Sequence, residues 1–461
     1  MTIWMPNLAD HQGPRYQAIA AAIADAVAEG ALAPGDKLPP QRDLAYQLGV
    51  TVGTVSRGYM LAEQQGLVGG EVGRGTYVRE ATRSVAGPIA PPPETGPLDL
   101  GINMATWRVH GEALAAALAD ISAADGLENL LRYVPPAGHP EHCAVGARFI
   151  ERIGLDVSPN NVVLTHGAQQ ALAATFDVLA GPDRTILAEE FTYSGVVENG
   201  RLRGVTLEPV ALDKEGMMPD ALDAAAARSN ARAVLLVPTV QNPTASVMGA
   251  ERRAEIVRVA KARDLIIIED DVYGYLLPGR PPPIAAMAPE RTVYIASASK
   301  CLAPGLRVGW LVPPDRLVEA FVDVIYAQSV AQTGLAHEII GRWIDDGTAT
   351  RLIDALRKEI EARQAIAGEL FEGFKVRGHP SSFHLLLDLP APWRRDEFVA
   401  AALARGIRIN SLASFAIEPE KAPEAVRISL AAAPDRATLG EALETLRDLA
   451  LAGPRSSRAV V

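Results

Sequence analysis

The sequence predicts an α/β protein in which a small helical unit precedes a large layered unit. After residue 98, short apolar runs alternate with helical stretches, which is the pattern of a mainly parallel sheet covered by helices. Near residue 81 the composition changes to a proline-rich stretch, which is typical of an extended linker. We therefore expect a first domain at 1–80, a linker at 81–97 and a second domain at 98–461.

Composition and charge limit the class of protein. The 461 residues are 48% hydrophobic, which suits a soluble protein with a large core. No apolar run approaches the roughly 18 residues that cross a membrane, and residues 1–10 do not resemble a secretory signal, so we expect a cytoplasmic protein. The cysteines, Cys143 and Cys301, are too few for a disulfide-built fold. With a net charge of −11, any contact with nucleic acid must be local.

The first domain begins with three short helical patterns. Residues 16–29 carry apolar side chains at helical spacing, and residues 41–48 form a second short pattern that ends at Gly49. Thr51 can cap a third helix that runs to about residue 65. A glycine-tipped hairpin, or wing, follows. Two short helices joined by a tight turn and followed by a wing are a geometry that reads DNA.

Five side chains of this domain are candidates for contact with DNA. The third helix would enter the major groove by its first turn, while arginines outside that helix can reach phosphates. The candidates are Arg42, Thr51, Thr54, Arg57 and Arg74. Residues 1–80 contain more acidic than basic side chains, but the balance reverses within 37–79. We expect modest, salt-sensitive binding that needs two copies of the chain.

The strings LPPQRDLAYQLGVTVGTV and GLVGGEVGRGTYV resemble the winged helix of GntR-type bacterial regulators. The helix signals, the turn glycine and the wing glycines follow the family order. The alternative is a small helical bundle without a DNA-reading role, but the wing string GRGTYV favours the reader. Val52 and Gly53 depart from the family, which usually has a long polar residue at the start of the reading helix.

The second domain is expected to have a larger and a smaller part. The expected buried strands of the larger part, about 130–330, are Val162–Leu164, Thr185–Ala188, Ala233–Val237, Leu265–Ile268 and Thr292–Ile295. Helical patterns lie between most of them, at Gln169–Leu179, Met218–Ala227 and Ala250–Arg263. In the smaller part, about 334–455, long helices flank short strands, which predicts an α+β arrangement.

The strongest chemical signal is the string YIASASKCLAPGLRVGW at 294–310. Lys300 supplies an amine that can condense with an aldehyde once it is partly desolvated. Ser297 and Ser299 offer hydroxyls, with Ser297 the better candidate for phosphate, and Arg307 offers a guanidinium fork. A lysine in such a string is on its own usually a surface residue. The whole string resembles the Schiff-base segment of fold-type I pyridoxal-phosphate aminotransferases.

Further strings match that family in chain order. In LTHGAQQAL, Gly167 and Ala168 stand at a helix N-terminus, where backbone N–H groups can bind phosphate. The resemblance implies that Tyr193 stacks on the cofactor ring and that Asn242 donates to the 3′-oxygen of the cofactor. The structural alternatives are a core aromatic for Tyr193, a helix N-cap for Asp270 and a salt-bridge residue for Arg427, but seven matches in order make coincidence implausible.

The remaining matches concern the ring nitrogen and the carboxylate of an amino acid. The resemblance implies that Asp270 pairs with the ring nitrogen and that Tyr273 bonds the 3′-oxygen. Asp271 is a competing choice, and the spacing to Tyr273 favours Asp270. Tyr133 is implied to reach the phosphate of the partner subunit, and Arg427 to clamp the α-carboxylate of an amino acid.

Together, a GntR-type reader, a linker and a fold-type I domain resemble the MocR-type regulators over essentially the whole chain. The resemblance implies a homodimer, head-to-tail, that binds operator DNA and carries pyridoxal 5′-phosphate as a Schiff base on Lys300. The signal would be a small amino compound or the cofactor itself, and no metal is implied. The alternative is an active aminotransferase that acts on an amino acid and has an accessory N-terminal domain. The sequence does not fix the effector, the operator, or whether the outcome is activation or repression.

Overall fold

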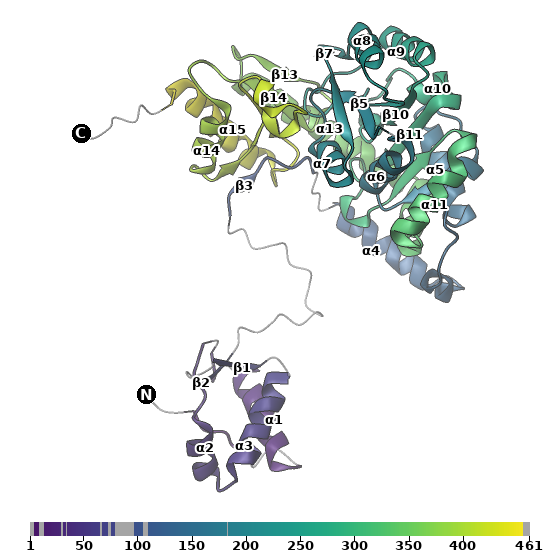
Figure 1. The fold of residues 1–461 in the computed structure, drawn as a ribbon. Helices are drawn as coiled ribbons and strands as arrows, with labels where there is room; N and C mark the ends of the chain where they lie inside the picture. The colour runs from purple at the N-terminus through teal and green to yellow at the C-terminus, as the bar shows by residue number, and fades with distance from the viewer. Residues whose placement is uncertain are drawn as a thin grey trace. The chain divides into compact units, whose positions relative to one another are not determined.

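The computed structural model divides into two compact units, Met1–Thr95 and Gly96–Val461 (Figure 1). It describes residues 4–8, 13–28, 31–33, 35–64, 67–71, 75–78, 96–104, 109–181 and 183–454. Most of the expected linker, and Arg74 in the expected wing, therefore lie outside the described residues. No helix in the described ranges is long and apolar enough to cross a lipid bilayer.

The first unit contains three helices and a hairpin. The elements are α1 (Arg15–Ala28), α2 (Gln41–Leu48), α3 (Val52–Gln64), β1 (Val68–Glu71) and β2 (Gly75–Val78). Ile19, Leu44 and Val55 are each fully buried in a shared core, because each helix turns its apolar stripe inward. Helices α1 and α3 cross closely at Gly58, where an added Cβ would lie 2.8 Å from Cγ2 of Ile19. A glycine is therefore needed at this crossing.

The second unit is built on a seven-stranded sheet. Its strands lie in the order β4-β12-β11-β10-β9-β5-β6. Their bounds are β4 (Val163–Thr165), β5 (Thr185–Glu189), β6 (Thr206–Val210), β9 (Ala233–Leu236), β10 (Ile266–Asp270), β11 (Thr292–Ser297) and β12 (Gly309–Val312). Strand β12 pairs antiparallel with both of its neighbours, and the other pairings are parallel. The predicted mainly parallel α/β sheet is confirmed.

Helices cover both faces of this sheet. One face packs against α6 (Ala168–Leu179) and α11 (Val318–Ser329), and the other against α8 (Pro219–Arg228) and α9 (Ala250–Ala262). Neighbouring strand residues enter different cores, because successive side chains of a strand point to opposite faces. This burial on both faces explains why the strands read as continuous apolar runs.

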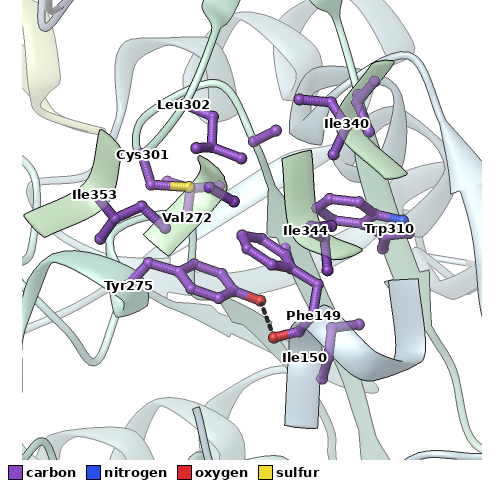
Figure 2. Close-up of a cluster of buried hydrophobic side chains, with 14 of the residues drawn as sticks. Phe149, Ile150, Val272, Tyr275, Cys301, Leu302, Trp310, Ile340, Ile344 and Ile353 are labelled. Carbon is purple, nitrogen blue, oxygen red and sulfur yellow. Dashed lines mark hydrogen bonds between the residues drawn. The ribbon is translucent and has the colours of Figure 1, made fainter. Parts of the chain in front are cut away.

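A third cluster of buried side chains packs beside the large sheet. It contains Phe149 of α5 (Pro140–Glu151), Tyr275 and Trp310, and the Tyr275 hydroxyl donates a hydrogen bond to the Phe149 carbonyl over 3.2 Å (Figure 2). Helix α12 (Gly334–Asp345), which the sequence assigns to the smaller part, shares this core through Ile340 and Ile344. The long helix α13 (Thr348–Leu370) leads from here to the smaller sheet.

The smaller sheet has four strands in the order β13-β14-β17-β16. Their bounds are β13 (Val376–Gly378), β14 (His384–Asp388), β16 (Asn410–Ser411) and β17 (Ala425–Ser429), with α14 (Arg395–Leu403) and α15 (Arg436–Ala452) packed against them. The short strand β3 (Leu98–Asp99) pairs with β15 (Ile407–Arg408) beside this sheet (Figure 1). The first described residues of the second unit are thus attached to its smaller part.

Candidate functional site

A cavity of about 370 Å³ lies at the carboxyl ends of the large sheet's strands. Ligands of open α/β sheets bind at this edge, because the loops and helix N-termini that follow the strands meet there. Segment 101–103 and residues of the smaller sheet line the same cavity. Ten of the residues predicted from the sequence line it: Ala168, Tyr193, Asn242, Asp270, Tyr273, Ser297, Ser299, Lys300, Arg307 and Arg427.

Lys300 follows β11 and turns its amine into the cavity. Its Nζ donates a hydrogen bond to the backbone carbonyl of Asn103 over 2.7 Å. Burial and the positive charge of Arg427 lower the pKa of the lysine from 10.5 to about 8, although Asp270 acts in the opposite direction. A larger share of the amine is therefore neutral near pH 7, and the neutral amine is the form that attacks an aldehyde.

The N-terminus of α6 forms a cradle for an anion. Gly167 precedes the helix with a φ of 75°, and a Cβ there would lie 2.7 Å from Nη2 of Arg307. The guanidinium of Arg307 donates to the His166 carbonyl over 3.3 Å and to Oγ of Ser299 over 3.4 Å. Ser297 donates instead to the carbonyl of Val308 over 3.0 Å, so Ser299 is the hydroxyl that faces Arg307. Backbone N–H groups, a hydroxyl and a guanidinium suit a phosphate group.

The two neighbouring aspartates have different surroundings. Asp270 lines the cavity, and among the described residues only the Val272 N–H, at 3.4 Å, donates to it. Burial raises its pKa from 3.8 to about 7, and the Val272 N–H and the positive charge of Lys300 offset this rise only in part. Asp271 is buried elsewhere, where it pairs with Arg280 and accepts the Tyr294 hydroxyl over 2.7 Å. Of the two, Asp270 is the carboxylate that fits the protonated nitrogen of a pyridine ring.

Arg427 lies on β17 and is 3% exposed. Its guanidinium donates to Oδ1 of Asn242 over 2.9 Å and to the Gly101 carbonyl, and it lies 4.5 Å above the ring centre of Phe415. Within the described ranges, no carboxylate forms an ion pair with it. Burial lowers its pKa to about 10, yet it remains charged at neutral pH. A buried cation with neutral partners is suited to bind the carboxylate of a ligand.

The predicted tyrosines lie in different places. Tyr273 is 3% exposed and accepts a hydrogen bond from Nδ2 of Asn103 over 3.1 Å, and Tyr193 lines the cavity at the start of α7 (Ser194–Arg203). Tyr133 is 87% exposed and does not line the cavity of its own chain. Its contact with a partner subunit therefore stays a prediction.

Several lining residues had no signal in the sequence. Asn103, Asn410 and Phe415 line the cavity, and the fully buried His384 contacts Asn103 from β14. Each of them reaches the site from a segment far along the chain from Lys300, so no local string could reveal it. Asn103 lies a few residues after the expected linker, outside every motif that the sequence analysis identifies.

In the first unit, the candidates for DNA contact lie at the start of two helices. Arg42, Thr51 and Arg57 are exposed, and Thr54 is half-buried. Thr51 Oγ1 accepts the Thr54 N–H over 3.2 Å, which caps α3 as the sequence predicts. The start of α3 is exposed at Thr51, Val52 and Gly53, as direct readout requires, whereas Val55 of the same turn is buried in the core.

Comparison with known proteins agrees with both units. Residues 97–446 match the model for aminotransferase class I and II. The chain belongs to the aminotransferase class I and II family. Residues 15–78 match the model for bacterial regulatory proteins of the gntR family. The MocR-type combination that the sequence predicts, a GntR-type reader ahead of an aminotransferase-like domain, is confirmed.

This member of the aminotransferase family has relatives that span both units. It is 28% identical over 446 residues to the uncharacterized HTH-type transcriptional regulator YdeF of Bacillus subtilis, covering 97% of this chain and 96% of that protein. It is 26% identical over 410 residues to the pyridoxine biosynthesis transcriptional regulator PdxR of Corynebacterium glutamicum, covering 84% and 86%.

The second unit also resembles solved enzymes. The α-aminoadipate aminotransferase LysN of Thermus thermophilus superposes with a TM-score of 0.70 at 24% identity, covering 78% of this chain and 93% of that one. The kynurenine aminotransferase of Pyrococcus horikoshii superposes with a TM-score of 0.72 at 21% identity, covering 78% of this chain and 92% of that one. These likenesses show the fold of the second unit.

Proposed function

We propose that this protein is a DNA-binding transcription regulator that carries pyridoxal 5′-phosphate on Lys300 and senses a small amino compound through it. One observation carries the proposal: a gntR-type reader shares a chain with a cavity where Lys300, Asp270 and Arg427 converge. A DNA-reading unit has no evident use in a metabolic enzyme, whereas a regulator needs both a reader and a ligand site.

Different residues of the cavity would bind different parts of the cofactor. The α6 N-terminus, Arg307 and the nearby serine hydroxyls would bind its phosphate, and Asp270 would pair with its ring nitrogen. Tyr193 would stack on the ring, while Asn242 and Tyr273 would bond the 3′-oxygen. When bound, pyridoxal phosphate withdraws electrons from the bonds at the α-carbon of an amine attached to it. The desolvated amine of Lys300 is the group that would attach the cofactor.

The effector would be an amino compound that carries a carboxylate. Its amine would take the place of Lys300 on the cofactor, and its carboxylate would bind Arg427, which now contacts Asn242 and Gly101. Occupation of Arg427 would thus change contacts between the smaller sheet and the rest of the unit. We further propose a head-to-tail homodimer, in which Tyr133 reaches the phosphate in the partner subunit and two readers bind DNA together.

The proposal is tested with full-length protein and the variant Lys300→Ala. Borohydride reduction followed by peptide mass spectrometry should find the cofactor on Lys300 in the parent and none in the variant. A mobility-shift assay on the DNA upstream of the gene should show binding by both proteins and a response to amino acids in the parent alone. Lys421→Ala, which removes an exposed lysine paired with Glu418, is the matched control. A parent without label, or an unchanged response in Lys300→Ala, would refute the sensor role.

A second candidate is an active aminotransferase, and the assembly of the expected chemical groups in one cavity favours it. The test is turnover of an amino donor with 2-oxoglutarate, measured on the same preparations. Steady turnover together with no DNA binding would favour the enzyme. DNA binding that responds to amino acids would favour the regulator.

A further inference from the structure

Asn103 joins three distant parts of the second unit at the wall of the cavity. Its backbone carbonyl accepts Nζ of Lys300 over 2.7 Å, and its side-chain Nδ2 lies 3.1 Å from the Tyr273 hydroxyl and 2.8 Å from Nδ1 of His384. The asparagine is 5% exposed, so water does not compete for these bonds. No chemical role has so far been assigned to it.

His384 fixes the direction in which the Asn103 amide points. Its Nε2 lies 3.2 Å from the carbonyl of Gln241, which can only accept, so Nε2 carries a proton. Burial and the charge of Arg427 lower the pKa of His384 to about 3, so the ring is neutral and its Nδ1 is an acceptor. The Asn103 atom that faces Nδ1 must therefore be the donor Nδ2.

This order of donors continues to Tyr273. One N–H of Asn103 Nδ2 is used by His384, and the other is donated to the tyrosine oxygen. Since that oxygen already accepts, its own proton is available to another acceptor. In the described part of the chain, Tyr273 Oη makes no second hydrogen bond, and Tyr273 lines the cavity.

We propose that Asn103 is a positioning residue that turns the hydroxyl proton of Tyr273 toward the 3′-oxygen of the bound cofactor. This inference rests on the proposed cofactor site and adds a residue that acts through Tyr273. The chain of bonds runs from the Gln241 carbonyl through His384 and Asn103 to the tyrosine, and it ends at the cofactor.

Other charged groups also act on the Tyr273 hydroxyl. Burial raises its pKa to about 12, and Asp270 and Tyr193 act in the same direction, whereas the bond from Asn103 and the charge of Arg427 lower it. The His384 ring also packs edge-on against Tyr273. Among these groups, the structure gives only Asn103 a direct hydrogen bond to the hydroxyl. By lowering the pKa, this bond makes Tyr273 a stronger donor.

The test is a pH titration of the visible absorbance of the full-length, cofactor-loaded protein. The titrating group is the nitrogen that joins Lys300 to the cofactor, and loss of its proton leaves more negative charge on the 3′-oxygen. A hydrogen bond donated by Tyr273 stabilises that charge and lowers the midpoint. Asn103→Ala should therefore raise the midpoint by about half to one pH unit, a three- to tenfold change in proton affinity. An unchanged midpoint would overturn the inference.

A double-mutant cycle separates positioning from general disruption. If Asn103 acts through Tyr273, Asn103→Ala should add no further shift in a Tyr273→Phe background, whereas additive shifts would contradict the inference. Asn161→Ala is the matched control, because it makes the same substitution at a residue that donates a hydrogen bond to Asp315 and does not line the cavity. Its midpoint should equal that of the parent.

Folding and cofactor loading are controlled on the same samples. If Asn103→Ala does not yield folded protein, Asn103→Ser serves in its place, because a serine hydroxyl is too short to join His384 and Tyr273. Borohydride labelling of Lys300 shows whether each protein is loaded. An unlabelled parent would overturn the proposed function and this inference with it, whereas a labelled parent and an unshifted labelled variant would overturn the inference alone.

Discussion

Replacing Asp270 by asparagine should stabilise the cofactor-free protein, and more so at higher pH. The folded state raises the pKa of this carboxyl from 3.8 to about 7. The folded protein therefore holds a proton that the unfolded chain releases, and the free energy of unfolding falls as the pH rises from about 4 to about 7. Above about pH 7 the Asp270 carboxyl is ionised in both the folded and the unfolded protein. The folded protein then carries the full free-energy cost of burying that charge.

The magnitude follows from the size of the shift. Each pKa unit corresponds to about 1.4 kcal/mol, so the cost of Asp270 grows by about 2–3 kcal/mol between about pH 5 and about pH 8. The asparagine side chain does not titrate, so its own cost of burial cancels in the comparison. The advantage of Asp270→Asn over the parent should therefore grow by about 2–3 kcal/mol across this range. Chemical denaturation of the cofactor-free proteins at both pH values measures it.

Asp271→Asn is the matched comparison, since it makes the same change one residue along. It removes the partner of Arg280 in a pair whose side chains are 5% and 0% exposed, so it should destabilise the protein by about 3–5 kcal/mol at both pH values. Saturating pyridoxal phosphate should abolish the advantage of Asp270→Asn, because the parent then has a cation beside its carboxylate. Equal behaviour of the two variants, or an advantage independent of pH, would refute the reasoning.

Four further predictions concern both units. Arg42→Ala should weaken DNA binding and reduce the slope of log affinity against log salt by about one, and an unchanged slope in mobility shifts would contradict a phosphate contact. Gly58→Ala should destabilise the first unit by about 1–3 kcal/mol in a thermal melt, because the added Cβ would clash with Ile19. Borohydride labelling of Lys300 should be unchanged, and its loss would show that the two units do not fold independently. Arg427→Lys should weaken binding of amino acids about tenfold to a hundredfold in an absorbance titration, while amines without a carboxylate should bind as before. The rate of cofactor incorporation, measured by stopped-flow absorbance, should rise with pH and level off above about 8, because the neutral amine of Lys300 is the reactive form. A rate that falls as the pH rises would exclude the neutral amine as that form.

The sequence predicted the parts of the site that lie in continuous strings. Lys300 and Arg307 lie in a single strand–turn–strand segment, so their spacing alone places them together. Helix limits were also close: α6 begins at Ala168 rather than Gln169, and α9 ends at Ala262 rather than Arg263. Strand β12 is absent from the strands that the sequence predicts, and its antiparallel direction depends on how the chain turns back after β11.

The contacts that depend on distant segments could not be predicted. The bond from Asn103 to His384 spans 281 residues, and its bond to Tyr273 spans 170, so each exists only once the sheets are assembled. Likewise, the sequence left Asp271 as a competing choice to Asp270 for the partner of the ring nitrogen. Successive side chains at the end of a strand point in opposite directions, so the pleat of β10 decides which aspartate reaches the cavity.

The pairing of β3 with β15 bears on how freely such proteins can be rearranged. Leu98 is the third residue of the second unit, and the carbonyls of Gly101 and Asn103 hold Arg427 and Lys300 soon after it. A protein trimmed to its cofactor-binding part must therefore begin ahead of Leu98, or both cations lose a partner. A different DNA-reading unit can be grafted only upstream of this strand. The position at which the DNA-reading unit can be exchanged thus lies only a few residues before the backbone carbonyls that contact Arg427 and Lys300.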